Sequence, residues 1–233
     1  HEAFGGNLYQ LVVGGAPIRP EIGKFFNDIG IMLLNGYGIT ECSPLVSVNR
    51  KNYNNDPATV GVILPCCQVE IRNKNDEGDG EIWVKGDIVM MGYYKMPEET
   101  KETLVNGYLK TGDLGYIDED NYLYITGRRK NLIILANGEN VSPEELENGL
   151  LENRMVKEIV VSEEKDVIKA EVFPDYDYLD KKKVKNVQEE IQNIVDKYNR
   201  ELPSYKRINK VYIRKDEFEK TTSQKIKRQY VKK

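Results

Sequence analysis

The opening of the chain alternates between strand, helix and strand, and this alternation constrains the fold more than any other feature of the sequence. Residues 8–13 and 31–34 are apolar, β-prone runs, and residues 20–27 between them begin with proline and suit a helix. This order predicts a parallel βαβ unit. Parallel strands need cover on both faces, which about 55 residues cannot supply alone. We therefore expect this unit to be the end of a larger α/β layer.

The pattern changes after residue 60. Short strands alternate with turn residues as far as residue 125, which predicts a small antiparallel sheet. A short helix is expected to begin at Pro97 inside it, because proline is tolerated in the first turn of a helix.

After residue 127 the pattern becomes α+β. Ser142 and Pro143 predict the start of a helix, residues 156–161 and 167–172 alternate like paired strands, and residues 180–198 carry a helical apolar stripe.

The expected fold class is thus α/β and α+β mixed. We expect the end of a βαβ layer in residues 1–59, a small antiparallel β subdomain in residues 60–126, and a small α+β C-terminal domain in residues 127–233.

Residue types exclude several classes of protein. No apolar run reaches the roughly 18 to 20 residues that a membrane-spanning helix needs, so no transmembrane segment is expected. The three cysteines, an odd number without metal-like spacing, favour a cytoplasmic protein. His1 is the sole histidine, which argues against Ser/His/Asp triads and histidine-ligated zinc. Any chemistry must therefore use carboxylates, lysines, arginines, backbone amides or a cation that a substrate brings.

Charge is distributed unevenly along the chain. The net charge is −4, yet residues 203–233 hold 11 basic and 3 acidic side chains. A basic tail can attract polyanions. However, neither an aromatic-interleaved basic platform nor a recognised nucleic-acid-binding motif accompanies this charge. We therefore interpret the tail as a solvated lysine-rich surface and expect no nucleic-acid partner.

The segment at residues 36–41, GYGITE, follows an apolar strand, at the place where open α/β sheets bind ligands. We expect a glycine-flanked turn here. Thr40 could contact a phosphate, and Glu41 offers a hard oxygen ligand for Mg²⁺. Taken alone, the segment favours a turn whose polar side chains serve only the local backbone.

Two later segments are also ambiguous when each is taken alone. Asp113 is expected in a glycine-bracketed turn, where its carboxylate could hold a ribose diol or simply form a local turn. Residues 127–130 suit a charged linker, and residues 220–226 form a polar loop that presents lysines.

The order of the motifs is more informative than any one of them. The sequence contains GGAP, GYGITE, GEIWVKGDIVMMGYY, YLKTGDLGYID, ITGRRKNLIILANGENVSPEELE and EKTTSQKIKR. In this order they closely resemble the acyl-adenylate-forming superfamily of acyl-CoA synthetases, peptide-synthetase adenylation domains and luciferases. The resemblance covers essentially the whole chain, and NGENVSPEELE is most similar to bacterial long-chain fatty acid CoA ligases.

The resemblance implies a role for each matching residue. The residues that it places at the nucleotide and acyl pocket are Gly15, Ala16, Pro17, Gly36, Tyr37, Gly38, Thr40, Asp113 and Arg128. Among these, Thr40 would contact phosphate, Asp113 the ribose, and Arg128 would help hold the nucleotide.

Four further residues match positions with other roles in the family. Glu41 would be the Mg²⁺ ligand, Lys130 the hinge, Gly138 part of the channel for the pantetheine arm of coenzyme A, and Lys225 the catalytic lysine. The motif around Lys225 departs from the family pattern, because Gln224 replaces the usual glycine and the usual upstream proline is absent. Lys220 and Lys227 therefore remain rivals for the catalytic role.

The implied function is that of an AMP-forming acid–thiol ligase. It would activate a carboxylic acid, and a fatty acid above all, with Mg·ATP, and then transfer the acyl group from the acyl-adenylate to coenzyme A. The family's upstream phosphate-binding loop has no counterpart in this sequence, so we expect a C-terminal half that is inactive alone. Two alternatives stay open: an adenylation or docking module that serves a carrier protein, and a piece without activity of its own.

Overall fold

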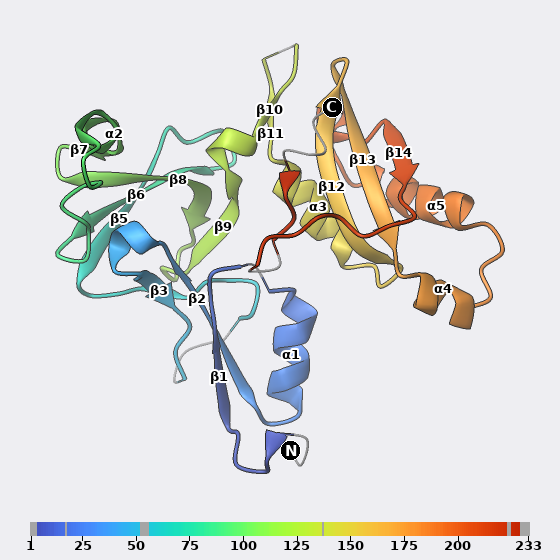
Figure 1. Cartoon of the computed structure of the whole chain (residues 1–233), viewed down its shortest axis with the longest axis horizontal. Coiled ribbons are helices and arrows are strands. Elements are labelled where there is room, and N and C mark those ends of the chain that lie inside the picture. The colour runs from blue at the N-terminus through green and yellow to red at the C-terminus, as the bar shows by residue number, and fades with distance from the viewer. Residues whose placement is uncertain (1–3, 17, 52–55, 137, 223–224, 229–233) are drawn as a thin grey trace. The chain divides into compact units, whose positions relative to one another are not determined.

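The computed structural model describes residues 4–16, 18–51, 56–136, 138–222 and 225–228 (Figure 1). The chain divides into two compact units, His1–Lys130 and Asn131–Lys233. Each unit has its own apolar core. No helix among the described residues is long and apolar enough to cross a membrane. The domain boundaries expected after residues 59 and 126 stay predictions.

The first unit opens with the expected βαβ arrangement. Strands β1 (Gln10–Val13) and β2 (Met32–Gly38) are parallel, and helix α1 (Pro20–Asp28) connects them (Figure 1). Two antiparallel strands, β3 (Leu45–Val48) and β4 (Val62–Ile63), complete this sheet in the order β1-β2-β3-β4.

The turn expected at residues 36–38 is wrong, because β2 continues through Gly38. The missing side chain permits a close approach of the backbone here. A Cβ atom on Gly38 would lie 2.0 Å from the carbonyl oxygen of Pro44. Pairing with β3 therefore overrides the local turn preference of the glycines. The chain turns only afterwards, in the short 3₁₀ helix η2 (Thr40–Cys42).

The second sheet of this unit is antiparallel throughout, as expected. Its order is β5-β6-β8-β7, and β9 also pairs with β8. The strands are β5 (Cys67–Arg72), β6 (Gly80–Gly86), β7 (Leu104–Val105), β8 (Tyr108–Ile117) and β9 (Leu123–Arg128). The helix expected at Pro97 is α2 (Pro97–Thr103). Ile82, Val84, Leu109 and Leu123 of this sheet share a core with Val46 of β3.

Two more local predictions are wrong in this sheet. Asp113 does not lie in a turn but inside β8. Gly127 and Arg128 belong to β9 rather than to a linker, and only the 3₁₀ turn η3 (Arg129–Asn131) follows them. The cause is pairing between distant segments, since Asp113 lies opposite Arg128 across the two strands. The preceding residue, Gly112, has φ +71°, a left-handed backbone conformation that glycine adopts without steric cost.

The second unit is built on a three-stranded sheet. Strands β12 (Val156–Glu164) and β13 (Val167–Pro174) are antiparallel, as expected, and β14 (Lys210–Ile213) pairs in parallel with β13. Helices α3 (Pro143–Leu151) and α5 (Val187–Asn199) cover one face of this sheet (Figure 1), and their buried side chains share its apolar core. A small hairpin, β10 (Ile133–Ile134) and β11 (Asn140–Val141), precedes α3.

The single helix expected over residues 180–198 is wrong. The structure has two helices there, α4 (Tyr176–Lys181) and α5, and a break between them. Lys183 has φ 58°, which no α-helix accommodates. The side chain of Asn186 then caps α5 by accepting a hydrogen bond from the Glu189 amide at 3.2 Å.

Several cations of the basic tail form ion pairs within the second unit. They include Lys206 with Glu145 at 3.0 Å, Lys210 with Glu164 at 2.5 Å and Arg214 with Glu171 at 3.1 Å. Part of the tail's positive charge is thus neutralised locally.

Candidate nucleotide-binding site

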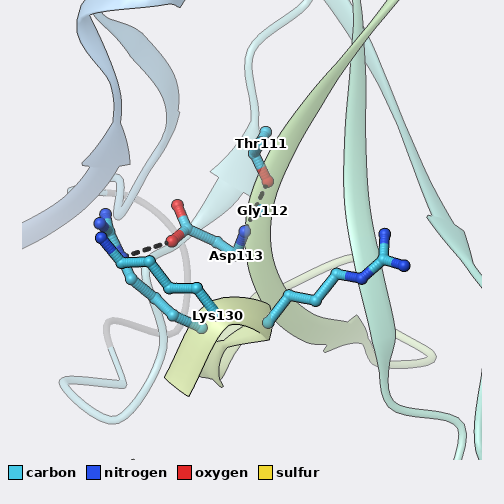
Figure 2. A pocket seen from close by; sticks show the side chains of 6 residues that line it. Thr111, Gly112, Asp113 and Lys130 are labelled. Atoms are coloured by element: carbon cyan, nitrogen blue, oxygen red, sulfur yellow. Dashed lines mark hydrogen bonds and ion pairs between the residues drawn. The ribbon is translucent and has the colours of Figure 1, made fainter. Parts of the chain in front are cut away.

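An open cleft of about 520 Å³ lies in the first unit where β8, β9 and η3 meet (Figure 2). The residues that line it are Thr111, Gly112, Asp113, Arg128, Arg129 and Lys130. It combines one buried acid with three cations, which suits an anionic ligand that also carries hydroxyl groups.

Asp113 is the centre of this arrangement. Its side chain is almost fully buried, and its Oδ1 lies 2.8 Å from Nε of Arg128, as the dashed line in Figure 2 shows. Its other oxygen, Oδ2, accepts a hydrogen bond of 2.7 Å from the hydroxyl of Tyr37. The backbone amide of Asp113 donates to Oγ1 of Thr111 at 3.1 Å (Figure 2). The carboxylate is therefore fixed in orientation from both sides.

Tyr37 reaches this carboxylate from strand β2, 76 positions earlier in the chain. Burial, reinforced by the neighbouring Asp113 carboxylate, raises the pKa of the Tyr37 hydroxyl far above its usual value. The hydroxyl thus stays protonated and donates to Asp113. The structure brings together three residues that the sequence had placed at a nucleotide site: Tyr37, Asp113 and Arg128.

Glu41 lies in η2, and one of its carboxylate oxygens accepts a hydrogen bond of 2.8 Å from the hydroxyl of Tyr93. Burial, together with this carboxylate, raises the pKa of Tyr93. Sequence reasoning missed Tyr93, although its segment was among the matching motifs. Thr40 is exposed beside Glu41, at the start of η2.

The site offers Mg²⁺ one protein carboxylate, that of Glu41. No group of three or more His, Cys, Asp or Glu side chains that could hold a metal ion occurs among the described residues. Mg²⁺ commonly takes only one or two carboxylates from a protein and completes its shell with substrate phosphates and water. Glu41, oriented by Tyr93, can supply one such carboxylate.

Gly14, Gly15 and Ala16 of the GGAP segment lie between β1 and α1. Gly15 has φ +82°, and both Gly15 and Ala16 are exposed. A Cβ atom on Gly14 would lie 3.2 Å from the carbonyl oxygen of Gly36, so this segment runs beside β2. Pro17 lies outside the described residues.

Two of the remaining candidates lie in the second unit. Gly138, at φ +86°, stands in the tight turn of the β10–β11 hairpin, where its amide donates to the Leu135 carbonyl at 2.8 Å. Lys225 is exposed in a hairpin near the C-terminus, where Lys220 and Ile226 form an antiparallel bridge. Lys130, in η3, is the last residue of the first unit.

The sequence matches two protein-family profiles. Residues 1–94 match the profile described as AMP-binding enzyme, and residues 130–233 match the profile described as the AMP-binding enzyme C-terminal domain.

Two curated relatives are named as CoA ligases. A long-chain-fatty-acid–CoA ligase of Bacillus subtilis is 35% identical over 230 residues, which cover 95% of this chain and 40% of the relative. The ligase FadD15 of Mycobacterium bovis is 38% identical over 159 residues, or 68% of this chain and 26% of the relative. The chain therefore spans well under half the length of the relatives it matches.

Solved structures share the fold. The o-succinylbenzoate CoA synthetase of Bacillus subtilis, in complex with the acyl-adenylate intermediate OSB-AMP, matches with a TM-score of 0.80 and 28% identity over 96% of this chain and 46% of that chain. ATP-bound MatB from Rhodopseudomonas palustris matches with a TM-score of 0.80 and 27% identity over 94% of this chain and 44% of that chain. With its two profile matches and its ligase relatives, the chain belongs to the acyl-adenylate-forming family of AMP-binding enzymes.

Proposed function

We propose that this chain forms the C-terminal part of an AMP-forming acid–thiol ligase. The enzyme converts a fatty acid and Mg·ATP to acyl-adenylate and pyrophosphate, and then transfers the acyl group to coenzyme A. The observation that carries the proposal is the buried Asp113 carboxylate, held between Tyr37 and Arg128 at the edge of an open cleft. The choice of a fatty acid follows the names of the ligase relatives.

The hydrogen-bonding sites left on the Asp113 carboxylate suit a ribose. An ionised carboxylate has about four lone-pair sites on its two oxygens. Tyr37 takes one site and Arg128 takes another, so about two remain for the two hydroxyl groups of the ribose. Arg128, whose side chain is 47% exposed, can contact the nucleotide while it holds Asp113. Gly15, Ala16, Pro17, Gly36 and Gly38 would form the surrounding wall.

The chemistry requires cations, because a carboxylate must attack a phosphate that is also negatively charged. Glu41 would hold Mg²⁺, which neutralises phosphate charge when it is bound, and Thr40 would donate to a phosphate oxygen. The exposed ammonium of Lys225 would bridge the acid and the α-phosphate and stabilise the charge that develops between them. Lys225 is thus the proposed catalytic residue.

We assign the second half-reaction to the Gly138 hairpin. Apart from its chain neighbours, no described residue lies within 4 Å of a Cβ position on Gly138, which leaves room for the pantetheine arm of coenzyme A. A pantetheinylated carrier protein would present the same arm, so it remains the alternative acceptor. The free cysteines Cys42, Cys66 and Cys67 agree with a cytoplasmic location, which is part of the proposal.

The test is ATP–pyrophosphate exchange by the full-length enzyme. Palmitate should stimulate the exchange far more than acetate or benzoate does. Exchange that no carboxylic acid stimulates would refute the adenylation chemistry, and stimulation by benzoate alone would refute the fatty-acid assignment.

Lys130 carries a separate prediction, because η3 joins the two units at this residue. If its backbone rotates between the two half-reactions, Lys130→Pro should spare one half-reaction and impair the other, since proline fixes φ near −65°. The half-reactions are measured separately, as pyrophosphate exchange and as thioester formation from synthetic acyl-adenylate. The matched control is Lys130→Ala, which should leave both intact. Equal loss of both in a stable Lys130→Pro variant would identify an ordinary linker.

A further inference from the structure

The proposed catalytic lysine stands in a short hairpin whose described residues are joined by hydrogen bonds between its two arms. The amide of Thr221 donates to the Lys225 carbonyl at 2.8 Å, and the amide of Lys225 donates to Oγ1 of Thr221 at 3.1 Å. One further bond joins the amide of Lys227 to the Glu219 carbonyl at 2.8 Å. A short exposed hairpin of this kind is marginally stable by itself. Its position therefore depends on how its two ends are anchored.

The first end is anchored on the face of the sheet away from α3 and α5. Phe218 is buried there against Val160 and Phe173, and its amide donates to Glu158 at 2.9 Å. Lys220, the next anchor, forms ion pairs with Glu158 and Glu217.

The second end is anchored by a charge pair on helix α3. Arg228 forms an ion pair with Glu147, and its guanidinium also lies 3.4 Å from Glu144, one turn earlier on the helix. The other carboxylate oxygen of Glu147 accepts a hydrogen bond of 2.7 Å from the Val161 amide of strand β12. Glu147 thus joins the helix, the sheet and the segment that follows Lys225.

Burial makes this pair sensitive to the loss of either partner. The side chain of Glu147 is 9% exposed and that of Arg228 is 26% exposed. Removing one partner from such a pair leaves the other charge buried without compensation, which is strongly destabilising. An exposed ion pair such as Lys157 with Glu217 contributes far less to the stability of the fold.

We infer that Glu147 is a positioning residue: by holding Arg228 it fixes the C-terminal end of the hairpin, and thereby sets where the Lys225 ammonium lies. Glu144 assists as a second acceptor. It also accepts a hydrogen bond of 2.5 Å from Asn131 in η3. This inference rests on the proposed role of Lys225, but the anchoring itself can be measured without any assay of activity.

The first experiment is hydrogen exchange of the 233-residue chain. Glu147→Gln keeps an oxygen acceptor for the Val161 amide but loses the charge that holds Arg228. Exchange of the amides of residues 219–228 should accelerate about tenfold, the scale of coupling between contacting charged groups. Arg228→Gln should have the same effect, and the double variant should add little. The matched control, Lys157→Gln, removes an exposed pair beside the same hairpin and should change exchange little.

The pH dependence of hairpin opening tests the pairing of Glu147 with Arg228 independently. Burial raises the pKa of Glu147 to about 7, whereas Arg228 acts to lower it and Glu144 to raise it. Because docking of Arg228 favours ionised Glu147, docking should weaken as the pH falls through about 7. After correction for intrinsic exchange, hairpin opening should increase as the pH falls towards about 7 in the wild type but not in Glu147→Gln.

The second experiment separates this inference from the proposed function. In the full-length enzyme, Glu147→Gln should slow adenylation, less than Lys225→Ala does, and spare thioester formation from acyl-adenylate. Unchanged hairpin exchange in both Glu147→Gln and Arg228→Gln would overturn the inference. The inference would also be overturned if Glu147→Gln loosens the hairpin but adenylates normally, while Lys225→Ala is inactive. If Lys225→Ala is itself fully active, the proposed role of Lys225 fails, while the exchange data still decide the anchoring.

Discussion

Replacing Lys225 with alanine in the full-length enzyme is expected to slow acyl-adenylate formation about 10²- to 10³-fold, the scale seen when one preorganised electrostatic donor is removed from an active site. The physical reason is that the attack of a carboxylate on a phosphate concentrates negative charge, which the ammonium would stabilise in the transition state. Thioester formation from synthetic acyl-adenylate and coenzyme A should be nearly unaffected, because the adenylate is already made.

Two neighbouring lysines provide the matched controls for this experiment. The ammonium of Lys220 is engaged by Glu158 and Glu217, and that of Lys227 lies 3.8 Å from Glu219, whereas Lys225 is exposed. Lys220→Ala and Lys227→Ala should therefore retain more adenylation activity than Lys225→Ala. A loss confined to adenylation that is larger in either control than in Lys225→Ala would move the catalytic role to that lysine. Full activity of Lys225→Ala would refute the assignment.

Asp113→Asn is expected to raise the KM for ATP about 10- to 100-fold, because hydrogen bonds to a charged group contribute roughly 1.5 to 3 kcal/mol each. Asparagine has nearly the same shape and can still accept from Tyr37, so the fold should persist. It cannot, however, form an ion pair with Arg128 or offer two charged oxygens to a ribose. Steady-state kinetics with varied ATP measures the effect.

Asp120→Asn is the control for this variant, since Asp120 is an exposed acid in the turn between β8 and β9. It should leave the KM for ATP unchanged. An unaltered KM in a folded Asp113→Asn protein would exclude Asp113 from the nucleotide site, and equal effects of the two variants would indicate a nonspecific loss of charge.

Sequence patterns predicted those elements whose local signals agree with their tertiary environment. The helix at Pro143 and the strand pair β12 and β13 have apolar periodicities that match the faces they bury, and the βαβ opening follows the order of its local signals. The errors occurred where distant pairing overrides local preference. Glycines favour turns, yet Gly36 and Gly38 lie in β2 because β3 approaches them closely.

The site could be predicted only in part for the same reason. Motif order predicts separate roles for Asp113 and Arg128, but their contact follows from the strand register. The hydroxyl contact of Tyr37 with Asp113 and the pair of Glu147 with Arg228 join residues 76 and 81 positions apart. Periodicity and spacing describe the neighbourhood of a residue along the chain, so they carry no information on such contacts.

The full-length enzyme is proposed to join a fatty acid to coenzyme A through an acyl-adenylate. The most direct measurement is a single reaction of palmitate, Mg·ATP and coenzyme A in which all nucleotide and acyl products are quantified. We expect AMP and palmitoyl-CoA to form in equal amounts, and omission of coenzyme A to leave palmitoyl-adenylate on the enzyme. Formation of ADP and phosphate instead of AMP, or acyl transfer only to a pantetheinylated carrier protein, would contradict it.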